Sequence, residues 1–129
     1  MARTALLLIA HGSRRAEANA DLEHVAREMR ATGEFAVVEC AYLELAQPDI
    51  ETGATGCVAQ GVGRVVLLPY FLSAGVHVDR DLTAMRARLA ERFLDVEFCL
   101  AEPLGRHAGL VQIVKDRAME ASKKSKSQK

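Results

Sequence analysis

The stretch Thr4-Ala5-Leu6-Leu7-Leu8-Ile9-Ala10-His11-Gly12-Ser13 decides the fold of this 129-residue chain. Its apolar residues continue to Ala10 without the polar alternation of a half-buried strand, which indicates a strand covered on both faces. The apolar run then breaks at a histidine, a glycine and a serine. A buried strand that ends in a polar turn and leads into a helix is typical of parallel sheets in α/β proteins.

Strand-like and helix-like patterns alternate along the rest of the chain. An apolar stripe over residues 18–29 predicts a helix that ends at Gly33, and Pro48 suits the first turn of a second helix. This order predicts an α/β fold with a single open four-stranded parallel sheet flanked by helices, in three layers (α/β/α). The expected strands are 4–10, 35–42, 64–70 and 96–100, and the last two helices are 79–92 and 107–121. Residues 1–121 form the expected domain, and residues 122–129 an expected lysine-rich, disordered tail.

Composition narrows the classes of function. Half of the residues are hydrophobic, and no apolar run approaches the roughly 20 residues of a membrane span. Because the features of a leader peptide are missing, we expect a soluble, cytoplasmic protein that does not bind membranes. The lysines crowded near the C-terminus leave a mildly acidic domain, which argues against nucleic acid as a partner. Cys40, Cys57 and Cys99 are widely separated, so we expect structural thiols rather than a zinc site.

Ionisable side chains follow the predicted strands, at the edge where ligands bind in such sheets. His11 follows the first strand, and His77 ends the loop after the third. The two imidazoles can therefore face one site as metal ligands or proton acceptors, or they merely cap backbone groups. Glu44, between two leucines, either shares protons or a metal with them or points outward into solvent. The loops of interest are 11–15, 42–48, 71–78 and 101–106.

The starts of two predicted helices suit an anion. Ser13 and Arg14, together with Arg15, combine free backbone N–H groups with guanidinium groups that bind carboxylate or phosphate. N-capping by Ser13 is expected in either case. Ser73 and Gly75 precede the third helix and can offer N–H groups in the same way.

The remaining signals favour structural roles. His24 lies on the polar side of the first helix, and His107 is expected to cap the last helix rather than to join the site. No Walker loop and no GxGxxG pattern follows a strand, which disfavours nucleotide binding. A hydrolase built on Ser13 is disfavoured because the first glycine of the GxSxG turn is missing.

Three segments together carry a family resemblance: LIAHGSR at 8–14, YLELAQP at 42–48 and LLPYFLSAGVHVDRD at 67–81. They resemble the class II tetrapyrrole chelatases, most closely the small CbiX-type sirohydrochlorin cobaltochelatases and the related ferrochelatases. The resemblance implies ATP-independent insertion of a divalent metal into sirohydrochlorin. It matches His11 and His77 to the family's histidines, as catalytic residues and metal ligands, and Glu44 to its catalytic glutamate. It also implies a single-domain form that pairs as a homodimer, with the cleft between the subunits.

The resemblance further implies how the substrate is held. Sirohydrochlorin carries eight carboxylates, which Arg14 and the amides after His11 and Ser73 can hold. The loop 70–72 either packs on the macrocycle or simply plugs the end of the sheet or the dimer interface. The substrate-binding candidates are Ser13, Arg14, Tyr70, Phe71, Leu72, Ser73, Ala74 and Gly75. No cofactor is expected beyond the substrate metal, which is Co2+ for cobalamin or, alternatively, Fe2+ or Ni2+. A ferrochelatase for sirohaem and a non-catalytic tetrapyrrole or metal carrier remain as alternatives.

Overall fold

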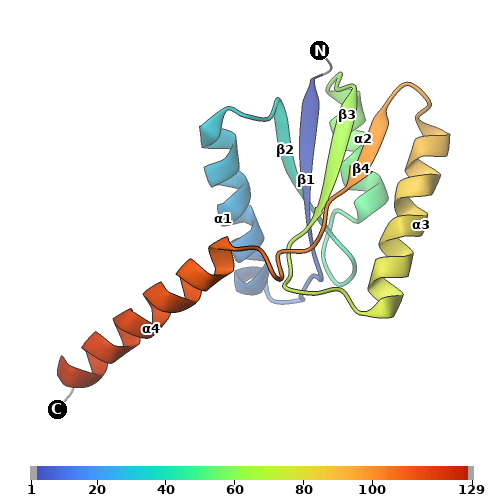
Figure 1. Ribbon diagram of the computed structural model, residues 1–129. Coiled ribbons are helices and arrows are strands. Elements are labelled where there is room, and N and C mark those ends of the chain that lie inside the picture. The colour runs from blue at the N-terminus through green and yellow to red at the C-terminus, as the bar shows by residue number, and fades with distance from the viewer. Residues whose placement is uncertain (1–2, 128–129) are drawn as a thin grey trace.

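The computed structural model describes residues 3–127, in which four strands alternate with four helices as predicted (Figure 1). The strands form one parallel sheet in the order β2-β1-β3-β4, so that β1 lies in its interior. The elements are β1 Thr4–Ala10, α1 Ala16–Thr32, β2 Val37–Tyr42, α2 Ile50–Ala59, β3 Arg64–Pro69, α3 Val76–Arg92, β4 Glu97–Leu100 and α4 Gly109–Ser127.

Strand β1 is buried on both faces, as its continuous apolar run predicts. Leu7 and Ile9 point into a cluster with residues of α2 and α3, whereas Leu6 and Leu8 point into a second cluster with Leu22 and Ala26 of α1. These four strand residues are at most 2% exposed. The two clusters make the three layers of the expected α/β/α fold, with the sheet in the middle.

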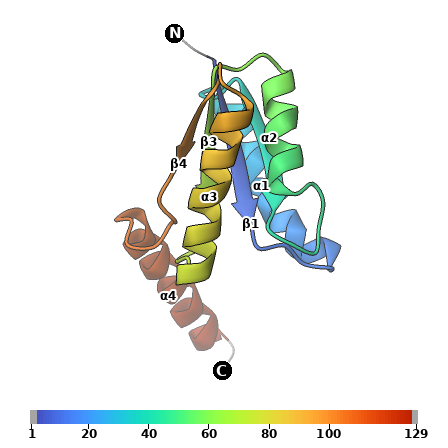
Figure 2. The same cartoon turned by 90° about the vertical axis from the view of Figure 1, so that its right-hand side faces the viewer.

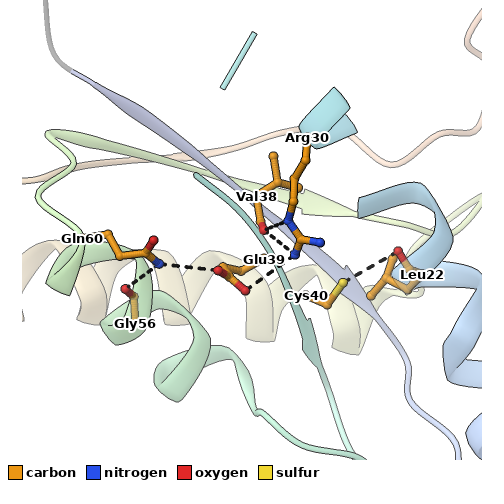
Figure 3. Close-up of polar contacts among 7 residues, drawn as sticks. All are labelled: Leu22, Arg30, Val38, Glu39, Cys40, Gly56 and Gln60. Carbon is orange, nitrogen blue, oxygen red and sulfur yellow. Dashed lines mark hydrogen bonds and ion pairs between the residues drawn. The ribbon is translucent and has the colours of Figure 1, made fainter. Parts of the chain in front are cut away.

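The outer edge of β2 is protected by polar contacts. The guanidinium of Arg30 on α1 donates from Nε and Nη2 to the Val38 carbonyl, at 3.0 and 2.7 Å, and lies 3.8 Å from the Glu39 carboxylate (Figure 3). Gln60 donates to Glu39 at 3.5 Å, and the Cys40 thiol donates weakly to the Leu22 carbonyl at 3.7 Å. Because the Arg30 guanidinium occupies the Val38 carbonyl, this backbone acceptor at the outer edge of β2 is not free to pair with another strand.

Several helix boundaries differ from the prediction. Helix α2 begins at Ile50 with Asp49 as its N-cap, so Pro48 lies before the helix and not in its first turn. Helix α3 begins at Val76, three residues earlier than expected, because the Gly75 carbonyl accepts a hydrogen bond from the Asp79 amide at 2.9 Å. His77 therefore lies in the first turn of α3 and not at the end of a loop. Helix α4 begins at Gly109, where His107 Nδ1 accepts from the Gly109 amide at 2.9 Å. This bond confirms the capping role of His107.

Helix α4 runs to Ser127, past the end near residue 121 that the sequence predicted. The residues expected as an unstructured tail thus form the last turns of a helix as far as 127, and residues 128–129 lie outside the described part. Figures 1 and 2 show α4 extending away from the sheet rather than packing on it. Among the described helices, none has the length and apolar character needed to cross a bilayer.

Candidate active site

The loops after β1 and β2 run side by side at the carboxyl edge of the sheet. The Leu43 amide donates to the Ala10 carbonyl, and the Glu44 amide donates to the His11 carbonyl, both at 3.0 Å. These bonds continue the pairing of the two strands beyond their ends. They place the backbones of His11 and Glu44 next to each other, and both side chains are exposed. An imidazole and a carboxylate therefore lie side by side at this edge of the sheet.

Gly12 interlocks these two loops. Its φ angle is +97°, and a Cβ atom built on it would overlap the carbonyl oxygen of Glu44 and lie 3.2 Å from Cβ of Tyr42. Only glycine combines this left-handed conformation with so close an approach of the neighbouring chain. The glycine of the His-Gly-Ser turn thus fixes His11 relative to Glu44.

Phe71 supports the imidazole of His11 from the loop after β3. The two ring centroids are 4.6 Å apart at an interplanar angle of 32°. Phe71 is half-buried and also packs against the core cluster beneath α2 and α3. One face of the His11 ring is therefore backed by a side chain that the core holds in place.

The loop after β4 holds the loop that carries Phe71. The Leu104 amide donates to the Phe71 carbonyl at 3.0 Å, and a Cβ atom on Gly105 would overlap the carbonyl oxygen of Leu72. Gly105 lies in the expected loop 101–106 but was not singled out as a site residue. A glycine in a strand-end loop carries too general a signal to be singled out without the contact it makes.

Ser13 does not cap α1, contrary to the prediction. The helix begins one residue after Arg15, which is its N-cap and makes no side-chain capping bond. Ser13 is instead held by Asn19: its amide donates to Asn19 Oδ1 at 3.0 Å, and Asn19 Nδ2 donates to its carbonyl at 2.8 Å. The Ser13 hydroxyl accepts from the Arg15 amide at 3.1 Å. Asn19 was missed because its role depends on the turn folding back over the helix.

The other predicted binding residues follow β3. Tyr70 is half-buried against the cluster on the α1 side of the sheet, so its ring belongs partly to the core. Leu72 is 63% exposed, and Ser73 is exposed beside it. Ala74 is half-buried, and Gly75 is the N-cap of α3. The beginning of this loop is thus held against the core, whereas Leu72 and Ser73 are exposed.

A pocket of about 580 Å3 opens beside His11 and Glu44, between the end of β2, the start of α2 and the first turns of α3. Its volume is in the range of small-molecule sites. Most of the charged side chains that line the pocket are carboxylates, and Arg88 carries the positive charge. The charged or titratable lining residues besides Tyr42 are His11, Glu44, Asp49, Glu51, Asp81 and Arg88. Asp81 and Arg88 were not predicted, because they come from the interior of a helix and not from a strand-end loop.

His77 is exposed on the first turn of α3 and does not line this pocket, although its neighbour Val78 does. The structure thus places His11 and Glu44 together and His77 at the same edge of the sheet, outside the pocket. Among residues 3–127, no cluster of three or more histidine, cysteine, aspartate or glutamate side chains is arranged to hold a metal ion.

The cysteines have the properties of structural thiols. Burial, with a smaller effect of the Glu39 carboxylate, raises the pKa of the Cys57 thiol to about 11. Desolvation also raises the pKa of the half-buried Cys40 and Cys99 thiols. Because a protonated thiol is a poor metal ligand and nucleophile, these residues are unsuited to the chemistry of the site.

Fold and site together define a class of α/β protein with an imidazole and a carboxylate at the carboxyl edge of a parallel sheet. The family model of CbiX matches residues 5–121, and the chain belongs to this family. The chloroplastic sirohydrochlorin ferrochelatase of Arabidopsis thaliana is 37% identical over 87% of the chain. The sirohydrochlorin cobaltochelatase of Methanopyrus kandleri is 30% identical over 91% of the chain. The family is thus one of metal-inserting enzymes.

Solved structures agree with this assignment. A putative cobalamin biosynthesis CbiX protein from Marinobacter aquaeolei superposes with a TM-score of 0.80 at 31% identity, over 94% of this chain and 98% of the other. The sirohydrochlorin chelatase SirB from Bacillus subtilis, in complex with cobalt, gives 0.82 at 30% identity over 92% of this chain. The chain spans half the length of SirB and of the Arabidopsis enzyme, and 96% of the Methanopyrus enzyme.

Proposed function

We propose that this protein inserts Co2+ into sirohydrochlorin, without ATP, on the route to cobalamin. The observation that carries the proposal is the placement of His11 beside Glu44 at the mouth of an acidic pocket, in a chain of the CbiX family. The metal is a substrate, because it leaves the protein within the macrocycle.

The reaction needs proton acceptors and a way to replace the water around the metal. Two pyrrole nitrogens must each lose a proton, and the incoming cation must exchange its water ligands for ring nitrogens. The neutral imidazole of His11 can accept a proton or ligate the cation during transfer. Glu44 can take the released proton, and His77, at the same edge, is the proposed second imidazole. The stack with Phe71 keeps His11 oriented for this exchange.

The charged residues around His11 divide into an acidic side, which suits the metal cation, and a basic side, which suits the anionic macrocycle. The pocket between α2 and α3 offers Glu44 and Asp81 to a cation, whereas Glu51 there is already paired with Arg92 at 2.7 Å. Arg14 and Arg15 are exposed on the opposite flank of His11, at the start of α1. We propose that the cation enters from the α2–α3 side and that carboxylates of sirohydrochlorin lie against the start of α1.

Iron insertion for sirohaem is the second candidate. It uses the same residues, and a ferrochelatase is among the relatives, at 37% identity.

The proposed enzyme is cytoplasmic, in keeping with three unpaired cysteines, and acts as a homodimer with the macrocycle between its subunits.

Turnover tests the proposal. Purified protein is mixed with sirohydrochlorin and excess Co2+, and the absorbance change of the macrocycle is followed under anaerobic conditions. We expect acceleration over many equivalents of protein, its loss in His11→Ala and in His77→Ala, and wild-type rates in His24→Ala, an exposed histidine of α1 that serves as the matched control. A change limited to one equivalent would indicate a carrier instead. Competition between Co2+, Fe2+ and Ni2+ in one assay ranks the metals.

A further inference from the structure

Two residues other than glycine adopt a left-handed backbone conformation within residues 3–127, and both lie in loops at the carboxyl edge of the sheet. Leu45 has a φ of +63° and Arg106 a φ of +66°. Residues with a side chain disfavour this region, and such strain is concentrated at functional sites. Leu45 directly follows Glu44, whose carbonyl lies against Gly12, so it belongs to the interlocked loops described above. Arg106 needs a separate explanation.

Arg106 occupies a position in a turn that suits glycine better. The His107 amide donates to the Leu104 carbonyl at 3.2 Å, which closes a β-turn over residues 104–107. Arg106 is the third residue of this turn, and its positive φ is that of a type II turn, in which glycine or asparagine is usual at this position. The glycine of the turn is instead its second residue, Gly105, whose missing Cβ leaves room for the Leu72 carbonyl. The turn therefore holds an arginine in a conformation that glycine adopts more easily.

The backbone on both sides of Arg106 is fixed. On one side, the Leu104 amide donates to the Phe71 carbonyl at 3.0 Å, and the Phe71 ring lies 4.6 Å from that of His11. On the other side, the His107 ring accepts the first amide of α4. The connection between β4 and α4 thus runs along the carboxyl edge of the sheet (Figure 1). Arg106 therefore has a defined place at the edge that carries His11.

The guanidinium of Arg106 has no partner within residues 3–127. The side chain is exposed and makes no hydrogen bond, ion pair or ring contact in this part of the chain, not even with Glu102, the acid of the same loop. By contrast, Arg30, Arg64 and Arg92 each pair with a carboxylate. A guanidinium that is held at a fixed place and is not used internally is suited to bind an anion from outside.

We infer that Arg106 binds a carboxylate on the rim of sirohydrochlorin, an inference that rests on the proposed function. A macrocycle with eight carboxylates can be held at more than one point of its rim. Arg14 and Arg15 follow β1, whereas Arg106 follows β4, which is two positions away in the sheet, or about 10 Å at the usual strand spacing. Cations thus reach this edge from two separate loops, and each planar guanidinium can bind a carboxylate through two hydrogen bonds.

The contact acts on binding and not on the chemical step. An arginine offers only N–H donors and keeps its proton, so Arg106 neither accepts a pyrrole proton nor ligates the cation. Its role is to orient the macrocycle over His11 and to favour tetrapyrroles that carry a carboxylate at this point of the rim. Arg106 is therefore a substrate-binding residue that determines specificity.

Three replacements of Arg106 test the contact. Arg106→Gly removes the charge and suits the φ of +66°, so its stability in urea is expected to equal or exceed that of the wild type. The KM for sirohydrochlorin is expected to rise about tenfold in Arg106→Gly and Arg106→Gln, and less in Arg106→Lys, which keeps the charge. The kcat and the KM for Co2+ should change little. Arg27→Gln removes the same charge from the exposed surface in the second half of α1 and should behave as the wild type.

Direct binding makes the test independent of turnover. Metal-free sirohydrochlorin is titrated anaerobically into each protein, and its fluorescence gives the Kd at two salt concentrations. We expect weaker binding with a smaller salt dependence in Arg106→Gly and Arg106→Gln, because one ion pair is lost. An unchanged Kd in these two variants overturns the inference, and so does an equal loss in Arg27→Gln, which would indicate general charge attraction.

The same titration separates this inference from the proposed function. If the wild type binds sirohydrochlorin but does not insert the metal, the proposed function fails, and the comparison of Kd values still decides the role of Arg106. A wild type that does not bind sirohydrochlorin overturns both.

Discussion

The backbone carbonyl of Glu44 occupies the space that a Cβ atom on Gly12 would need. The loops after β1 and β2 can come together in this way only because the first of them has no side chain at this point. His11 precedes the glycine, and its own carbonyl accepts the Glu44 amide. The relative position of imidazole and carboxylate is therefore set by backbone contacts and not by a bond between the two side chains.

Replacement of Gly12 by alanine tests this arrangement. Because the φ of +97° and the overlap with Glu44 both oppose a side chain, Gly12→Ala is expected to lower the free energy of unfolding by about 2 kcal/mol and to reduce chelation at least tenfold. Urea denaturation and the sirohydrochlorin assay measure the two effects. Gly56→Ala is the control: it faces open space on α2 and is expected to stabilise the protein by up to about 1 kcal/mol. Wild-type activity in Gly12→Ala would contradict the role of the interlocked loops.

Replacement of Phe71 tests the support of His11. Phe71→Leu keeps an apolar side chain against the core but removes the ring 4.6 Å from the imidazole. We expect kcat to fall about tenfold, with an altered pH profile, while KM changes little. Phe35→Leu removes a half-buried ring on the other face of the sheet and serves as the control, since each variant should lose about 1 kcal/mol of stability. If both variants lower kcat equally, the loss reflects general destabilisation and not the stack.

The elements of the fold could be predicted because the buried strands are nearly continuous apolar runs. The start of α3 could not be predicted from the sequence, because the stretch Val76-His77-Val78 contains two β-branched residues, which favour a strand or a loop. A backbone bond to Gly75, which has no capping side chain, decides the boundary. The predicted N-cap of α1 was wrong for a related reason. Ser13 is a good capping residue by type, but the turn folds back over the helix so that Asn19 binds it.

The site could be predicted as far as it depends on strand ends. In a parallel sheet the ends of neighbouring strands meet, and this rule by itself predicts that His11 lies near Glu44. Asp81 and Arg88 lie deeper along α3, and their place in the pocket depends on how α3 packs beside α2. Periodicity assigns residues to a helix but does not fix what the polar positions of that helix face.

Stability at alkaline pH is expected to depend on Cys57. Its pKa is about 11 in the folded protein and 9.0 ordinarily, so the unfolded chain loses the thiol proton first as pH rises. The stabilisation is complete below pH 9 and is lost between pH 9 and about 11. Urea midpoints measured from pH 8 to 11 should fall, and less steeply in Cys57→Ala. Equal slopes in the two proteins would contradict the assignment. At pH 8, alkylation of the native protein should reach Cys57 last.

Stability at acid pH is expected to depend on Asp49, the N-cap of α2. Its carboxylate accepts a hydrogen bond from the Thr52 amide at 2.8 Å, and this bond lowers the pKa of the carboxyl group below its usual 3.8. The folded protein therefore releases this proton more readily than the unfolded chain does. The contribution is complete above pH 3.8 and disappears as pH falls through the lower pKa of the folded state.

Two replacements of Asp49 separate the hydrogen bond from the charge. Asp49→Ala removes the acceptor and is expected to cost about 1 kcal/mol at pH 7. Asp49→Asn keeps an acceptor for the Thr52 amide, so its stability at pH 7 should lie within a few tenths of a kcal/mol of the wild type. The free energy of unfolding of Asp49→Asn should also fall less steeply as the pH is lowered, because the amide does not titrate. Urea midpoints at pH 7 and pH 3 provide the comparison. If Asp49→Asn loses as much stability at pH 7 as Asp49→Ala, the carboxylate acts through its charge on the helix terminus and not through the capping bond.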